Sequence, residues 1–396
     1  MNRMQTMYVA GLIAALSISF FSSCSEDSDR GDNSLRPIDI PAETRSYVDA
    51  ANDFSFRLMQ ALADESDDNF AVSPLSLTVS LSMFANAQTS LQAPTLEFLG
   101  FGSDDTALEL TNRYCHDMLT QLPSADRSTV CKFGNSVWTD DKTLLTPDFT
   151  STLKNDYLAE VFEKNPSGEK MRVEINKWIS RNTKGLIPDF LKTPLSCDMA
   201  LFNTAYFHGT WTKKFNPEKS RKEIFHNADG SVIRTDFMKQ NNFATYYEDE
   251  NMQMVALPYG NGNFEMVVIL PDEETDINSV ISDLDYKTFA EARANASDEL
   301  DLLSMPKFSI DYSRDLKSVF NSMGLTTSGK KDAINLLHGV NITVDEEGTV
   351  AAAVSGVVIT TGMHSRTEMI CDRPFAYIIR ETTTGAILFA GRVMKL

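Results

Sequence analysis

The stretch that decides the fold is Gly-Thr-Val-Ala-Ala-Ala-Val-Ser-Gly-Val-Val-Ile-Thr-Thr-Gly-Met, at residues 348–363. It contains no charged residue, no proline and no aromatic ring. If it forms a β-strand, alternate side chains share one face, and a sheet can bury that face without enclosing a charge. This face consists of Thr349, Ala351, Ala353, Ser355, Val357 and Ile359.

Both ends of this stretch are polar. Glu346 and Glu347 precede Gly348, which predicts a charged hinge with a flexible joint, and residues 360–366 have the composition of an exposed loop tip. An exposed, uncharged, β-prone segment promotes aggregation unless the protein uses it. We therefore expect a segment that leaves the body of the protein and can join a sheet. The alternative is an ordinary buried central strand.

The order of an acidic residue, glycine, threonine and then small residues resembles the reactive-centre loop of the serpin family of protease inhibitors. Further runs that resemble serpin motifs are Asn-Phe-Ala-Val-Ser-Pro-Leu-Ser-Leu (69–77), Ile-Asn-Lys-Trp (175–178), Thr-Lys-Gly-Leu-Ile-Pro (183–188) and Met-Pro-Lys-Phe (305–308). The resemblance covers residues 42–396. It implies an α+β serpin fold, with multiple helices around three β-sheets and an exposed reactive-centre loop.

The resemblance also assigns site residues. The hinge and the inserting segment comprise Glu346, Gly348, Thr349, Val350, Ala351, Ala352, Ala353 and Val354, although Val350 and Val354 depart from the family pattern. The region where the main sheet opens comprises Ser73, Ser76, Asn203 and His338. Within it, His338 is the expected hydrogen-bond partner of the Asn203 amide, because an unpaired buried amide costs about 1 to 3 kcal/mol.

The reactive bond has two candidate positions. Counting forward from Glu346 by the family spacing places the cut after Gly362, whereas counting back from Pro374 places it after Met363. We favour Met363-His364, because a long flexible side chain can enter an apolar specificity pocket and glycine cannot. A cut at Arg366 by a trypsin-like enzyme is the weaker option, since it lengthens the inserted strand.

The function implied by the resemblance is irreversible, suicide-substrate inhibition of serine endopeptidases, and also of papain-like cysteine endopeptidases, by a monomer. Met363 predicts targets that resemble elastase, chymotrypsin or subtilisin. The alternative is a non-inhibitory serpin that acts as a binding or carrier module on the cell surface. A charged or proline-rich hinge would favour that alternative, and this hinge has neither.

Composition and motifs exclude other classes. The net charge of -19 repels nucleic acid and anionic membrane surfaces. The sequence has no Gly-x-Ser-x-Gly elbow, no His-Glu-x-x-His and no phosphate-binding loop, so we expect no enzyme activity, no cofactor and no metal. Four widely spaced cysteines are expected to be buried thiols, although an exported protein permits disulfides: Cys115, Cys131, Cys197 and Cys371.

The first residues predict export. Arg3 precedes an apolar run at residues 9–21, and Ser22 and Ser23 stand before Cys24, which resembles a bacterial lipoprotein signal peptide with Cys24 as the lipidated residue. The alternative is an ordinary secretory signal. We expect a signal peptide at residues 1–23, an acidic flexible tether at 24–41 and a single serpin domain at 42–396. The expected location is the outer membrane or surface of a Gram-negative bacterium, otherwise the periplasm or the medium.

Periodicity and capping residues predict the main elements. Helices are expected at residues 42–63, 104–122, 171–184 and 277–295, and strands at 131–139 and 199–209. The pairs Ser73-Pro74 and Thr146-Pro147 each predict the start of a helix, with a hydroxyl cap before a proline.

Overall fold

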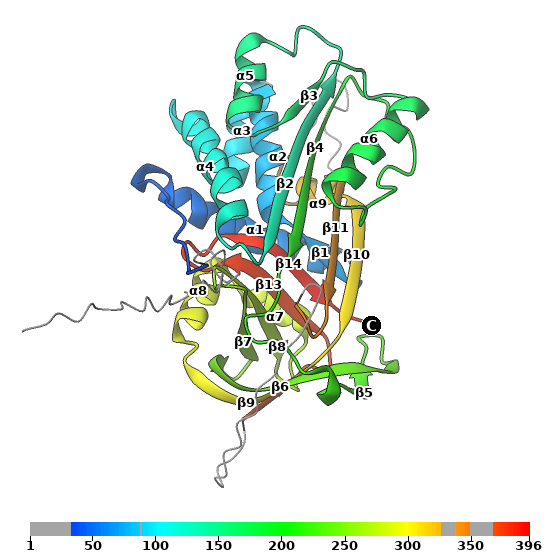
Figure 1. Cartoon of the computed structure of the whole chain (residues 1–396). Coiled ribbons are helices and arrows are strands. Elements are labelled where there is room, and N and C mark those ends of the chain that lie inside the picture. The colour runs from blue at the N-terminus through cyan, green and yellow to red at the C-terminus, as the bar shows by residue number, and fades with distance from the viewer. Residues whose placement is uncertain (1–32, 88, 326–336, 349–366) are drawn as a thin grey trace, which may run out of the picture. The chain divides into compact units, whose positions relative to one another are not determined.

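The structure is a computed structural model that describes residues 33–87, 89–325, 337–348 and 367–396 (Figure 1). Its helices are α1 Arg45–Glu65, α2 Pro74–Ala87, α3 Thr89–Leu99, α4 Ala107–Gln121, α5 Pro147–Asn155, α6 Glu169–Asn182, α7 Ile277–Asp283, α8 Tyr286–Asn295 and α9 Lys317–Ser322. Its strands are β1 Phe70–Val72, β2 Val130–Thr139, β3 Glu160–Phe162, β4 Met199–His208, β5 Arg221–His226, β6 Val232–Glu248, β7 Met252–Tyr259, β8 Phe264–Pro271, β9 Asp298–Pro306, β10 Phe308–Asp315, β11 Leu337–Val344, β12 Glu368–Ile370, β13 Phe375–Glu381 and β14 Ile387–Val393.

Helices α2 and α5 begin where capping residues predict. At α5, Pro147 occupies the first turn, and the Thr146 hydroxyl oxygen accepts a hydrogen bond from the Phe149 N–H at 3.2 Å. At α2, the Ser73 hydroxyl oxygen accepts from the Ser76 N–H at 3.3 Å. The expected helix at 42–63 appears as α1, after a short 3-10 turn at residues 42–44. Helix α3 was not predicted, because Pro94 interrupts its pattern.

The described strands form three hydrogen-bonded sheets, as the α+β serpin fold implies. The largest has the order β1-β14-β13-β8-β7-β6-β9-β12, with β5 paired to β6. A second sheet has the order β3-β2-β4, and a third pairs β10 with β11. The core lies against the centre of the largest sheet, where every residue of β8 and β14 is buried.

The predicted start of the domain at residue 42 is wrong, because residues 34–41 pack against the body of the protein. Ile38 and Ile40 are buried. The Arg36 N–H donates to the Asn263 side-chain oxygen at 2.8 Å, and the Ile38 N–H donates to the Thr383 hydroxyl at 3.0 Å. The exposed Asp39 separates the two isoleucines, so both isoleucine side chains lie on the same, buried face of this extended segment. We call residues 34–41 the N-terminal strap.

Three cysteines are buried, unpaired thiols: Cys115, Cys131 and Cys371. Burial raises the pKa of the Cys115 thiol to about 12, which leaves it protonated and unreactive at neutral pH. None of the helices among the described residues is long and apolar enough to cross a membrane.

Candidate functional site: an open sheet and the hinge beside it

Strands β4 and β11 each have one edge without a strand partner in the described part of the chain. On its other edge β4 pairs with β2, from Met199 to His208, and β11 pairs with β10 from Leu337 to Val344. Between β4 and β11 themselves, no ladder connects the residues that the structure describes (Figure 1). An unpaired edge presents N–H and C=O groups that an additional strand can bind.

Gly348 lies at the ends of both strands. It forms one antiparallel bridge with Thr210, just after β4, and another with Asp345, just after β11. Its φ is +121°, and a Cβ atom here would lie 2.3 Å from the Gly209 carbonyl oxygen. Only glycine satisfies both the conformation and the space. The two C-terminal ends therefore meet at Gly348, and β4 and β11 run parallel to each other.

Trp211 holds this end of the sheet together. Its backbone N–H donates to the Glu347 carbonyl oxygen at 3.0 Å, and its indole N–H donates to the Asp345 carbonyl oxygen at 2.9 Å. Its ring stacks on Tyr259 with centroids 4.3 Å apart. The hinge is thus attached to the β4 side by backbone and side-chain contacts together.

Two glutamates of the hinge are paired with lysines. Glu346 is buried, and its Oε1 accepts from the Ser220 hydroxyl at 2.6 Å and binds the Lys307 ammonium at 2.7 Å. Burial acts to raise the pKa of the Glu346 carboxyl, but hydrogen bonds from Lys307 and Ser220 hold that pKa below its usual value. Glu347 binds Lys214 at 3.0 Å. The Glu346 carboxyl is therefore charged at neutral pH.

The region where the main sheet was expected to open contains a buried polar cluster. The Ser73 N–H donates to His338 Nε2 at 2.9 Å, and the Ser73 hydroxyl donates to the Leu388 carbonyl oxygen at 2.7 Å. Burial lowers the pKa of His338 to about 3, so the imidazole is neutral and its Nε2 can accept. Ser73, Ser76 and His338 are thus brought together, as the resemblance implied.

Asn203 has a different partner from the one expected. Its Nδ2 donates to Asn135 Oδ1 at 2.5 Å, because Asn135 lies directly opposite on the paired strand β2. No hydrogen bond between Asn203 and His338 occurs among the described residues, where Ser73 occupies His338 Nε2. Asn203 Oδ1 and the Ser76 hydroxyl are both buried and have no hydrogen-bond partner within the described ranges. These two atoms can still bind another polar group.

The segment that follows α6 covers both strands. Phe202 of β4 belongs to the apolar cluster under α6. Phe190, in the segment after α6, and Leu337, the first residue of β11, pack against the same cluster. A Cβ atom at Gly339 of β11 would lie 2.6 Å from the Phe190 ring. A strand placed between β4 and β11 therefore has to displace part of this cover.

Several predicted residues lie outside the described part of the chain: Thr349, Val350, Ala351, Ala352, Ala353, Val354, Gly362, Met363, His364 and Cys24. Three hinge partners were not predicted: Trp211, Lys214 and Lys307. Lys307 stands in the Met-Pro-Lys-Phe run, but sequence spacing alone does not pair it with Glu346.

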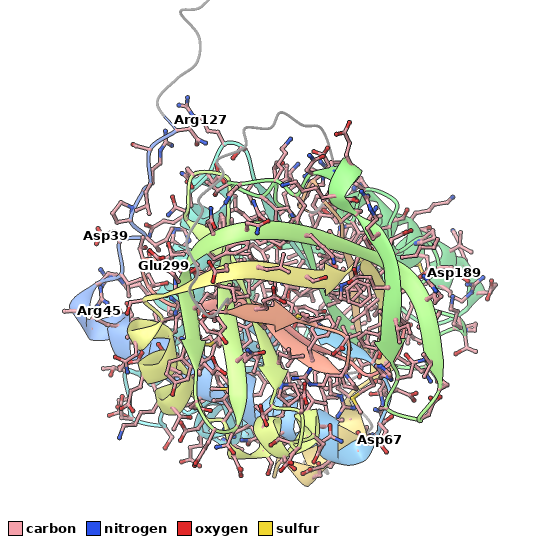
Figure 2. All side chains as sticks on the ribbon, turned by 90° about the horizontal axis from the view of Figure 1, so that it is seen from below. Asp39, Arg45, Asp67, Arg127, Asp189 and Glu299 are labelled. Carbon is pink, nitrogen blue, oxygen red and sulfur yellow. The ribbon has the colours of Figure 1, made fainter. Side chains whose placement is uncertain are left out.

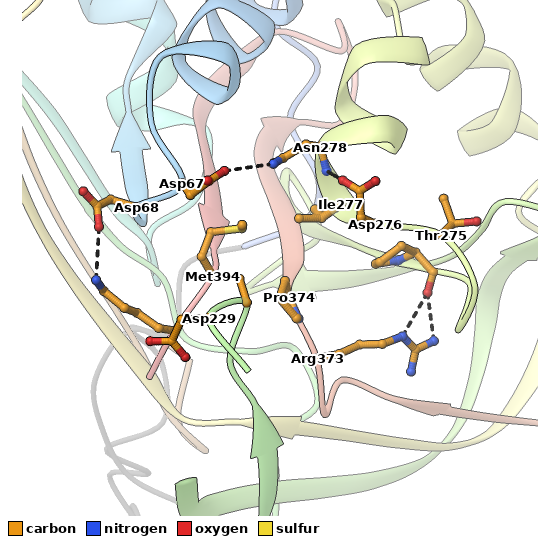
Figure 3. Close-up of a pocket in the computed structure, with 13 residues that line it drawn as sticks. Asp67, Asp68, Asp229, Thr275, Asp276, Ile277, Asn278, Arg373, Pro374 and Met394 are labelled. Carbon is orange, nitrogen blue, oxygen red and sulfur yellow. Dashed lines mark hydrogen bonds and ion pairs between the residues drawn. The ribbon is translucent and has the colours of Figure 1, made fainter. Parts of the chain in front are cut away.

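A cavity of about 610 Å³ lies away from the hinge (Figure 3). Its floor includes the buried side chains of Ile277 and Met394. The two cationic side chains that line the cavity have partners within the protein. Lys395 binds Asp68 at 3.1 Å, and the Arg373 guanidinium donates to the Pro271 carbonyl oxygen at 2.8 Å. The described residues contain no group of three or more His, Cys, Asp or Glu side chains that could hold a metal ion.

The described residues thus form an α+β fold in which two strand edges lack a strand partner and Gly348 bridges the ends of both strands. The serpin family profile, described as serine protease inhibitor, matches residues 49–396. Over 381 residues the chain is 30% identical to the plasma serine protease inhibitor of Bos taurus, with coverage of 90% of this chain and 93% of the relative.

Solved serpin structures have the same fold as this chain. The native thermophilic serpin tengpin superimposes with a TM-score of 0.80 at 26% identity, covering 92% of this chain and 97% of tengpin. Human thyroxine-binding globulin complexed with its hormone gives 0.78 at 26% identity, covering 89% and 99%. The chain belongs to the serpin family. The family profile is described as serine protease inhibitor, and the bovine relative carries that name, whereas thyroxine-binding globulin has the same fold and binds thyroxine.

Proposed function

We propose that this chain is an irreversible suicide-substrate inhibitor whose cleaved loop inserts between β4 and β11. The observation that carries this proposal is the pair of bridges at Gly348. Gly348 pairs antiparallel with Thr210 on the β4 side and with Asp345 on the β11 side. These are the first contacts that an inserted strand running antiparallel to both edges would make.

Extending the two bridges gives a register for the inserted strand. On the β4 side, Ala351 would lie opposite Phe207 and Ser355 opposite Asn203; on the β11 side the same residues would lie opposite Ile342 and His338. Phe207 and Ile342 are buried in the main core. In this register, both ladders would direct Thr349, Ala351, Ala353 and Ser355 toward the interior.

The side chains on the inward face of the proposed strand can be buried between β4 and β11. Thr349, Ala351 and Ala353 are small and uncharged, so their burial costs little. Ser355 would bring a hydroxyl between Asn203 and His338, where Asn203 Oδ1 has no protein partner. A hydrogen bond from Ser355 to this oxygen would satisfy a group that is otherwise costly to bury.

Hydrogen bonding supplies a driving force for insertion. A strand of about twelve residues, paired on both edges, can form roughly twenty-four backbone hydrogen bonds, because each residue has one N–H and one C=O, and each bond is worth about 1 kcal/mol net. The total is on the order of 20 kcal/mol, at least the stability of a whole domain.

The inhibitory step begins when the target protease attacks the reactive bond, for which we propose Met363-His364, with the bond after Gly362 as the alternative. The protease nucleophile forms an acyl-enzyme with the residue before the cut. Insertion of the fifteen residues from Thr349 to Met363 would carry the bound protease roughly 50 Å, at about 3.3 Å per residue. Trapping succeeds when insertion distorts the protease faster than water hydrolyses the acyl-enzyme.

We infer the target class from Met363, whose flexible apolar side chain suits the specificity pockets of elastase-like, chymotrypsin-like and subtilisin-like enzymes, and of papain-like ones. The test mixes residues 33–396 with pancreatic elastase, chymotrypsin, subtilisin, trypsin and papain. The readouts are a complex that survives a denaturing gel and the mass of the released C-terminal peptide, which identifies the bond.

Two variants test the insertion step. Thr349→Arg would place a charge on the buried face, so cleavage should proceed without trapping. Val350→Arg is the matched control, because Val350 would lie opposite the partly exposed residues His208 and Thr343 and should keep the inhibitor active. Trapping by the Thr349→Arg protein would refute insertion.

The second candidate function is a binding or carrier module. It is favoured by the cavity in Figure 3 and by the similarity to thyroxine-binding globulin, whose structure contains thyroxine. Cleavage of the loop by every protease without any trapped complex would support this candidate.

We further propose export as a lipoprotein anchored through Cys24. The Ser-Ser-Cys run after an apolar stretch supports this proposal. Replacement Cys24→Ser should release the protein from the membrane fraction of the producing bacterium, whereas retention would contradict a lipid anchor at this residue.

A further inference from the structure

A second cavity, of about 330 Å³, lies where four elements of the fold meet. Its lining includes Tyr247 of β6, Met252 of β7, Val280 of α7 and Ala292 of α8. It is distinct from the cavity in Figure 3, although Thr275 lines both. A cavity of this volume can hold a small organic molecule. We call it the α7–α8 cavity.

Part of the lining of the α7–α8 cavity is apolar. The side chains of Met252, Val280, Leu284 and Ala292 line the cavity and are themselves buried. The lining also includes the aromatic side chain of Tyr247. A ligand with an apolar body can therefore withdraw that body from water against these side chains, which favours binding in proportion to the apolar area that is buried.

Every charged side chain in the described lining of this cavity is acidic. Asp249 follows β6, Asp283 is the last residue of α7 and Glu291 lies on α8, so three separate segments each bring a carboxyl group to the cavity. Asp283 and Glu291 are exposed, and their carboxylates accept no hydrogen bond and bind no cation within the described part of the chain. Both carboxylates are therefore available to a ligand.

Cationic side chains on α8 do not neutralise these carboxylates. Lys287 lies one turn before Glu291 but forms no ion pair with it among the described residues. Arg293 binds Glu265 at 2.7 Å and does not line the cavity. The cavity in Figure 3 differs, because its lining includes two cationic side chains. The α7–α8 cavity thus has the more uniform negative charge.

Negative charge alone does not identify a site in this chain. The net charge is -19, and Asp39, Asp67 and Asp189, which are labelled in Figure 2, lie on three sides of the protein in that view. The α7–α8 cavity is distinguished by charge of one sign around a concave space whose walls are partly apolar. Such a space concentrates the field of its charges and attracts ions of the opposite sign.

We propose that the α7–α8 cavity binds a small organic cation, in which an ammonium group is carried on an apolar body. The ammonium group would bind the carboxylates of Asp283 and Glu291, and the ring of Tyr247 would add a favourable contact with the cation. The apolar body would occupy the space lined by Met252 and Val280. Repulsion from the carboxylates excludes an anion, and a bare metal ion would leave the apolar lining unoccupied. The site does not depend on the inhibitory function, since its lining residues belong neither to the hinge nor to β4 and β11.

The test measures binding to the full chain by isothermal titration calorimetry at physiological salt. The probes are phenethylamine, phenylethanol and phenylpropionate, which share one apolar body and differ in charge. We expect phenethylamine to bind with one molecule per chain, about tenfold more tightly than phenylethanol, because only the amine can pair with the carboxylates. Phenylpropionate should not bind.

Two double variants locate the binding site. Asp283→Asn with Glu291→Gln should weaken phenethylamine binding about tenfold, because it removes the two carboxylates that have no partner. Asp105→Asn with Glu109→Gln is the matched control, since these two exposed residues carry the same charge and line neither of the two cavities. The control should leave binding unchanged. Thermal unfolding checks that each variant is folded.

Four results would each overturn this proposal. They are the absence of phenethylamine binding, equal affinities for phenethylamine and phenylethanol, and equal losses of affinity in the two double variants, which would mean that only the overall charge matters. The fourth is displacement of phenethylamine by an equal concentration of Mg²⁺, because the carboxylates would then bind metal ions in place of organic cations. Protease trapping is measured on the same preparations, and its presence or absence does not bear on this cavity.

Discussion

Gly348 and Thr210 form an antiparallel bridge that joins the hinge to the end of β4. The contact is so close that a side chain at Gly348 would overlap the Gly209 carbonyl oxygen and the Trp211 backbone nitrogen, at 2.3 and 2.7 Å. The proposed insertion would depend on this arrangement, because the bridge would set both the register and the direction of the new strand.

The first prediction concerns Gly348. Gly348→Ala should lower the free energy of unfolding by roughly 2 kcal/mol, because it adds both a backbone strain and a steric clash. Denaturant unfolding measures the change. Gly230→Ala is the control, since Gly230 also has a positive φ, of +81°, but has open space around its Cβ position. Equal losses in the two variants would show that strain alone explains the glycine at 348.

The second prediction concerns pH and His338. The folded-state pKa of about 3 is below the usual value of 6.5, so the unfolded chain binds an additional proton between these pH values. Stability should therefore fall as the pH drops below 6.5, by up to about 1.4 kcal/mol per pH unit from this group. Unfolding measured from pH 7 to 4 should show a shallower slope for His338→Gln. An identical slope would exclude His338 as the titrating group.

The third prediction concerns the pair Glu346 and Lys307. Lys307→Met should cost about 1 to 2 kcal/mol, because it leaves a buried carboxylate without its cation. The Glu346 pKa is lowered in the folded state, so this loss should be present above pH 4.5 and should diminish as the carboxyl becomes protonated.

The control for that pair is Lys192→Met, which breaks the exposed pair of Lys192 with Asp189. Exposed pairs contribute about 0 to 1 kcal/mol, so this variant should have little effect. If both variants lose the same stability at neutral pH, burial of Glu346 is not responsible for the cost.

The fourth prediction concerns the N-terminal strap. The double variant Ile38→Ala, Ile40→Ala should lower the free energy of unfolding by roughly 3 kcal/mol, since both side chains are buried. Leu35→Ala is the control, because Leu35 is 47% exposed in the same segment. Thermal unfolding of residues 33–396 measures both. If the strap only tethers the domain, the double variant and the Leu35→Ala control should unfold at the same temperature.

Sequence patterns predicted the elements that carry a strong local signal. The caps at Ser73 and Thr146 start helices where expected. The alternating face of residues 349–359 lies outside the described residues and stays a prediction. The three-sheet arrangement followed from resemblance, because strand order depends on contacts between residues far apart in the chain.

Other features could not be predicted because they depend on which of several partners is nearest in space. Asn203 binds Asn135 and not His338, since β2 and β4 are paired at that register. The lysine partners of Glu346 and Glu347 lie 39 and 133 residues away in sequence, and no local pattern connects them. The strap was predicted as a tether because its two isoleucines are too few for a recognisable strand pattern.

The measurement that tests the central claim most directly is hydrogen exchange of the backbone amides in β4 and β11, before and after cleavage of the loop. If the loop inserts, exchange in residues 199–208 and 337–344 should slow markedly after cleavage, because both edges gain hydrogen-bond partners. The cleaved Thr349→Arg protein should keep the exchange rates of the uncleaved chain. Unchanged exchange in the cleaved wild-type protein would contradict insertion between these two strands.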